Sequence, residues 1–107
     1  MKTNKLFTFT YVVEYRGGTY CSQVKAKSLR DSVNNWIDLI SADSSQILHM
    51  GKQTIEQIKS LSQEEDNRPT LLHGLKNIWC ISFSTKHGFL LGNIILTETA
   101  ELNKIDF

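Results

Sequence analysis

The sequence predicts an α+β domain with the element order β-β-α-α-β-β, in which two antiparallel hairpins form a four-stranded sheet with helices on one face. Two stretches in which apolar and polar residues alternate around a glycine-containing turn predict hairpins at 6–26 and 77–98. Between them, apolar residues recur at helical spacing and predict helices at 29–41 and 52–62. A chain of this length can build one hydrophobic core and not two, so residues 1–107 are expected to form a single domain.

The first hairpin follows from apolar side chains at every second position over residues 7–15. The next two glycines, Gly17-Gly18, suit a two-residue turn, which requires positive φ angles. A loop of these two residues places Tyr15 opposite Tyr20 and keeps the apolar residues of both strands on one face. That face is expected to form the sheet side of the core.

The first helix is expected to begin after Ser28, which is a residue type that caps helix N-termini well. Its apolar stripe consists of Leu29, Val33, Trp36, Ile37 and Ile40, which makes Trp36 a core residue. A shorter stripe of Ile55, Ile58 and Leu61 predicts the second helix. Residues 62–76 start with a polar, acidic run and contain the only proline, so they are predicted to form an exposed loop.

The second hairpin is predicted with His87-Gly88 as its loop, which places Phe83 opposite Gly92. Its other face carries four large apolar side chains, here called the apolar patch: Ile78, Phe89, Leu91 and Ile95. A fully solvated sheet face should not hold such a group. We therefore expect either the tail at 99–107 or a second copy of the chain to cover the apolar patch, which is the candidate partner-binding surface.

Charge is distributed unevenly along the chain. The net charge is only +1, which is too small to indicate nucleic acid as the main partner. Residues 1–31, however, hold six basic and two acidic residues. The basic residues nearest the first hairpin and helix are Arg16, Lys25, Lys27 and Arg30. We expect them to contact an acidic partner, and weak nucleic-acid binding through Lys25, Lys27 and Arg30 stays open as an alternative.

Catalytic and metal-binding motifs do not emerge from the sequence. Cys21 and Cys80 fall in separate predicted strands and form no Cys-x-x-Cys pair. The three histidines lie at no ligand spacing, so neither a metal nor a cofactor is expected. A cysteine nucleophile would need a base that cannot be identified here, so the chain is expected not to be an enzyme.

A reducing compartment is expected, because two isolated cysteines make no disulfide framework. The longest apolar runs fall far short of the roughly 18 to 20 residues that a membrane span needs. We therefore expect a cytoplasmic protein that does not contact membranes.

One local resemblance is visible in residues 9–40. The order strand, Gly-Gly-x-Tyr, strand and then Ser-Leu-Arg-Asp-Ser-Val at a helix start resembles the N-terminal hairpin and helix of HicB-type antitoxins, which neutralise a small RNase toxin. It covers under a third of the chain. The family's Pro-Gly stretch before the helix and its DNA-binding tail are missing, so no residue role is transferred.

Taken together, these features predict a non-enzymatic protein-interaction module that self-associates, most simply as a homodimer, and that can bind another protein. An antitoxin or immunity-like inhibitor of a small enzyme is the alternative that the size, the charge asymmetry and the resemblance suggest.

Overall fold

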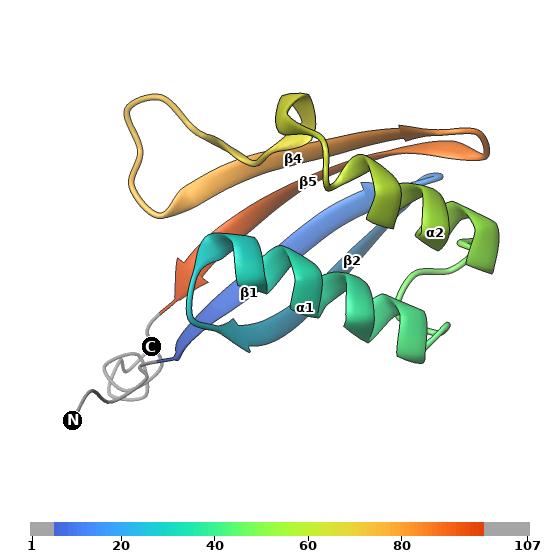
Figure 1. The fold of residues 1–107 in the computed structure, drawn as a ribbon, viewed down its shortest axis with the longest axis horizontal. Coiled ribbons are helices and arrows are strands. Elements are labelled where there is room, and N and C mark those ends of the chain that lie inside the picture. Colours follow the sequence, from blue (N-terminus) through green and yellow to red (C-terminus); the bar gives the residue numbers. More distant parts are fainter. Residues whose placement is uncertain (1–5, 98–107) are drawn as a thin grey trace.

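The computed structural model describes residues 6–97, and the tail predicted at 99–107 lies outside these residues. Its elements are β1 (Phe7–Tyr15), β2 (Gly18–Ala26), α1 (Leu29–Ala42), α2 (Lys52–Leu61), the short 3-10 helix η1 (Glu65–Asn67), β3 (Thr70–Leu71), β4 (Ile78–Thr85) and β5 (Gly88–Thr97). The strands form one antiparallel sheet in the order β2-β1-β5-β4-β3. Both helices lie on the same side of this sheet (Figure 1). The α+β class is therefore confirmed.

The prediction of a four-stranded sheet was wrong, because the sheet has a fifth strand, β3. This strand forms within the segment 62–76, which was predicted to be a loop. Thr70 pairs with Cys80, and the Leu72 N–H donates to the Ile78 carbonyl over 3.0 Å. Two residues show no alternation that could be recognised in a sequence. The strand exists only because the chain folds back onto β4.

The two hairpins are joined at the centre of the sheet, where β1 pairs with β5 from Thr8–Thr97 to Tyr15–Leu90. Gly92 of β5 lies opposite Val13 at this junction. A Cβ atom on Gly92 would lie 2.5 Å from the Val13 Cγ1 atom. The glycine therefore leaves the space that the Val13 side chain occupies.

Both hairpin loops lie one residue earlier than predicted. The loops are Arg16-Gly17 and Lys86-His87, so Tyr15 pairs with Gly18 and Phe83 with Leu90. Moving a two-residue loop by one position shifts every opposed pair by two residues, and each side chain stays on its predicted face. Apolar alternation cannot distinguish such registers, which is why the predicted partners were wrong while the faces were right.

The core lies between α1, α2 and the inner face of the sheet. Ser28 caps α1 by accepting a hydrogen bond from the Asp31 N–H over 3.1 Å. The rings of Tyr11 and Trp36 stack with their centroids 5.0 Å apart, and the Tyr11 hydroxyl lies 2.8 Å from the Ser32 Oγ atom. This contact fixes α1 over β1, since Trp36 and Ser32 both belong to the helix.

Arg16 occupies the left-handed region with φ 48°, and Gly17 follows with φ 86°. The left-handed conformation costs an ordinary residue roughly 1–2 kcal/mol, and asparagine tolerates it better. Arg16→Asn is therefore expected to raise the free energy of unfolding by about 0.5–1 kcal/mol, measured by urea denaturation. Arg16→Lys is the matched control, because it keeps the strain and should leave the unfolding midpoint unchanged. An Arg16→Asn protein no more stable than this control would contradict the turn geometry.

Burial raises the pKa of Tyr11 well above its ordinary value, and the hydrogen bond with Ser32 only partly opposes this shift. A raised pKa in the folded state means that the contribution of Tyr11 to stability is complete below the unfolded pKa of about 10 and falls as the pH rises above it. Tyr11→Phe should therefore reduce the loss of stability with pH above about pH 10, by up to about 1.4 kcal/mol per pH unit. Urea denaturation at several alkaline pH values measures this slope.

At neutral pH, Tyr11→Phe should lower the free energy of unfolding by about 0.5–1.5 kcal/mol, since one buried hydrogen bond is lost. Tyr15→Phe is the matched control. The Tyr15 hydroxyl is buried and has no hydrogen-bond partner in the described part of the chain. Its removal should be neutral or stabilising. Equal destabilisation by the two substitutions would contradict the contact with Ser32.

Candidate functional site

The sheet face that points away from α1 and α2, here called the outer face, carries the apolar patch. Ile78 of β4 lies directly opposite Ile95 of β5, and both are half-buried. Leu91 and Phe89 follow along β5 and are 44% and 54% exposed. Both helices lie on the other side of the sheet (Figure 1), so within residues 6–97 neither α1 nor α2 covers the outer face. The structure therefore brings the four predicted partner-binding residues onto one face.

Polar side chains divide and border the apolar patch. Asn93 and Cys80 face each other between the two isoleucines and Leu91. The neighbouring half of the outer face, on β1 and β2, is held by polar contacts, such as Gln23 Nε2 donating to Thr10 Oγ1 over 2.9 Å. The large apolar side chains of the outer face thus lie on β5 and at Ile78 of β4, and the part of this face on β1 and β2 is mainly polar.

The four predicted basic residues lie in two separate places. Lys25 is near the end of β2, Lys27 follows that strand, and Arg30 lies in the first turn of α1. Arg16 is in the loop at the opposite end of β2, about 30 Å away along a strand that rises roughly 3.3 Å per residue. All four side chains are exposed. Lys25 lies on the same face of β2 as Gln23, the outer face, whereas Arg30 lies on α1 at the other side of the sheet.

Arg16 instead borders a hollow of about 400 Å³ at the N-terminus of α2. The other basic or imidazole side chains at this hollow are His49, Lys52 and His87. Gly51 precedes the helix and provides no side-chain cap. Sequence reasoning missed this group because its members come from both hairpin loops and from the start of a helix.

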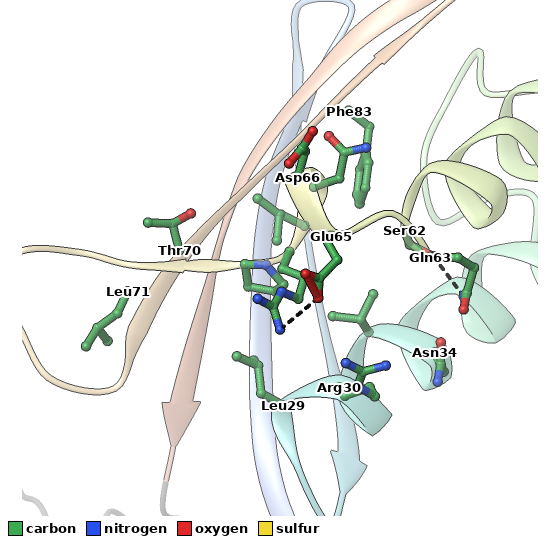
Figure 2. A pocket seen from close by; sticks show the side chains of 15 residues that line it. Leu29, Arg30, Asn34, Ser62, Gln63, Glu65, Asp66, Thr70, Leu71 and Phe83 are labelled. Carbon is green, nitrogen blue, oxygen red and sulfur yellow. Dashed lines mark hydrogen bonds and ion pairs between the residues drawn. The ribbon is translucent and has the colours of Figure 1, made fainter.

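A larger cleft of about 710 Å³ lies between α1 and the segment 62–71 (Figure 2). Arg30 and Asn34 line it from α1, while Glu65 and Arg68 line it from the segment and form an ion pair with 3.6 Å between Nη1 and Oε1. Phe83 closes the cleft from the sheet. The sequence did not predict this cleft, because its second wall exists only when the supposed loop packs against β4.

Reactive side chains do not gather in the described residues. No three His, Cys, Asp or Glu side chains of residues 6–97 lie close enough together to hold a metal ion. Cys21 is exposed on β2 and Cys80 is half-buried on β4, with β1 and β5 between them. Three strand spacings of roughly 4.8 Å separate the two strands, which is too far for a disulfide within one chain.

Comparisons with family models, with curated proteins and with solved structures find no match for this chain. The resemblance of residues 9–40 to HicB-type antitoxins therefore gains no support from them. In the described residues, no helix combines the length and the apolar character needed to cross a bilayer.

Proposed function

We propose that the protein is a non-enzymatic protein-interaction module that self-associates, with the apolar patch joining two copies. The observation that carries this proposal is the exposure of Phe89 and Leu91 beside Ile78 and Ile95, on a sheet face that neither α1 nor α2 covers. Single exposed apolar residues are ordinary, but here four large ones gather on one face of two adjacent strands, with the pair of Asn93 and Cys80 between the two isoleucines and Leu91.

A second copy is the simplest occupant, because two sheets can pack face to face with their apolar rows interlocked. The same patch on both copies makes the contact self-complementary around a two-fold axis. Removing apolar surface from water contributes roughly 25 cal/mol per Å², so a few hundred Å² contribute several kcal/mol before ordering costs. A stable interface of about 800 Å² per partner extends beyond the patch, and half-buried Val12 of β1 is the nearest apolar neighbour available.

The cytoplasm is the compartment that we propose for this module. Cys21 is an exposed free thiol and Cys80 is a half-buried one. Free thiols of this kind persist in reducing compartments.

A second candidate function is inhibition of a small enzyme, or weak nucleic-acid binding, through Lys25, Lys27 and Arg30. These three side chains are exposed, and none of them forms an ion pair with another described residue. Nucleic-acid binding should weaken steeply with salt in a mobility-shift assay. Absence of a shift at low salt would exclude that option and leave an acidic protein surface as the partner of this group.

Leu91→Lys tests the apolar patch as a contact between copies. A lysine at position 91 would be buried unpaired in the contact, which is unfavourable by several kcal/mol. We expect the weight-average mass, measured by light scattering at micromolar concentration, to exceed the 12.2 kDa of one chain in the unmodified protein and to fall in the variant.

Ser60→Lys is the matched control, since it adds the same charge at an exposed position of α2. Its mass should equal that of the unmodified protein. Equal masses for the Leu91→Lys and unmodified proteins would contradict a role for the apolar patch. So would an unmodified protein that stays at the mass of one chain.

A further inference from the structure

The two edges of the sheet differ in how their backbone groups are satisfied. At the β4 edge, β3 pairs with Cys80, the Leu72 N–H donates to the Ile78 carbonyl, and the Gln57 side chain accepts a hydrogen bond from the Lys86 N–H over 3.0 Å. The other edge is β2, the outermost strand beside β1 (Figure 1). It is nine residues long, contains no proline and carries one charged side chain, Lys25. Long, regular edges of this kind are templates for pairing with another strand.

The register shows which β2 groups are free. In a two-residue hairpin, the residues that flank the loop exchange both backbone hydrogen bonds, and bonded pairs then recur at every second position. Gly18 flanks the loop, so the even-numbered residues of β2 bond to β1 and the odd-numbered ones point outward. The Lys25 carbonyl agrees with this assignment, since it accepts a hydrogen bond from Asn35 of α1 over 2.9 Å.

Three residues therefore present unused backbone donors and acceptors at this edge: Thr19, Cys21 and Gln23. Their backbone groups have no partner among the described residues, and their side chains are exposed. They are arranged symmetrically around Cys21. An antiparallel copy of the same strand can therefore place Thr19 opposite Gln23 of the second chain, and Cys21 opposite itself, with each opposed pair exchanging two backbone hydrogen bonds.

We propose that two copies of the chain pair through their β2 strands, with Cys21 on the two-fold axis, so that one continuous sheet runs through both copies. In this register all three free residues form hydrogen bonds with the second copy. The paired segment ends before Lys25, whose carbonyl already accepts a hydrogen bond from the Asn35 side chain. No charged residue lies between Thr19 and Gln23, so no like charges meet within the paired segment. The contact is self-complementary, as a two-fold interface requires.

This contact is separate from the apolar patch. Antiparallel pairing around an axis perpendicular to the sheet keeps the outer faces of both copies on the same side. The two apolar patches then lie on the same surface of the joined sheet. Each patch is well away from the β2 contact, because β1 and β5 separate β2 from β4 in each copy. Pairing through β2 depends on backbone hydrogen bonds, so a substitution in the patch leaves it intact.

Disulfide trapping at Cys21 tests the pairing. The chain contains two cysteines, so Cys80→Ser leaves Cys21 as the only thiol. Residues of a bonded antiparallel pair have Cα atoms about 5.5 Å apart, which is within the range that a disulfide spans. We expect mild oxidation with copper phenanthroline at micromolar protein concentration to give a covalent dimer, seen by non-reducing electrophoresis.

Gln23→Pro in the Cys80→Ser chain removes one outward N–H without removing a bond to β1, and proline is tolerated at such edge positions. We expect the initial rate of disulfide formation to fall at least tenfold. Gln23→Ala is the matched control, because it removes the same side chain and keeps the N–H, and its rate should match that of the parent. Equal rates for the proline and alanine variants would overturn the proposal.

The register is tested by moving the thiol. A chain with Thr19→Cys, Cys21→Ser and Cys80→Ser should form the covalent dimer at least tenfold more slowly than the Cys80→Ser parent, because position 19 lies opposite position 23 of the second copy. A comparable rate would overturn the register. Leu91→Lys in the Cys80→Ser chain should leave the rate unchanged, so failure of this pairing and failure of the apolar patch give different results.

Discussion

The pairing of β1 with β5 is the constraint on which the rest of the structure depends. It joins residues near the two ends of the described chain, from Thr8 opposite Thr97 to Tyr15 opposite Leu90. Without it, each hairpin would be a two-stranded ribbon with little stability of its own. With it, one sheet forms that is wide enough for α1 and α2 to cover its inner face. Gly92 permits the junction because Val13 fills the space where a Cβ atom would lie.

The sequence was informative wherever a period extended over many residues. Alternation over both hairpins placed every side chain of the strands on its correct face, and the stripe from Leu29 to Ile40 marked the buried side of α1. The loops were misplaced by one residue, since alternation is unchanged by a two-residue shift of the partners. Arg16 takes a positive φ that sequence rules assign to the glycine pair beside it. The strand β3 was missed because only its contact with β4 makes it a strand.

The candidate surfaces likewise differ in whether the sequence alone could predict them. The apolar patch could be predicted, since the alternation of the second hairpin places Ile78, Phe89, Leu91 and Ile95 on one face. The cleft beside Arg30 and the hollow at the N-terminus of α2 could not, because each is assembled from segments far apart in the chain. The open β2 edge also required the strand order. The sequence of residues 18–26 alone does not show whether another strand pairs beside them.

The two proposed contacts depend on different physical forces. The apolar patch would bind by removing hydrocarbon surface from water, so its strength depends on side-chain size and on the absence of charge. The β2 edge would bind through backbone groups and is indifferent to most side chains. Both require the sheet to be complete within one chain, since an exchange of hairpins between copies would place the same residues in a different assembly.

A nuclear Overhauser measurement on an isotopically mixed sample tests this requirement directly. Tyr11 of β1 lies opposite Ile94 of β5, but the two residues exchange no backbone hydrogen bonds with each other, because the backbone of Tyr11 bonds to β2 and that of Ile94 to β4. The Cα atoms of such a non-bonded pair lie about 4.5 Å apart. The account predicts a strong contact between their Hα protons within one labelled chain. A contact seen only between labelled and unlabelled chains, or none at all, would contradict it.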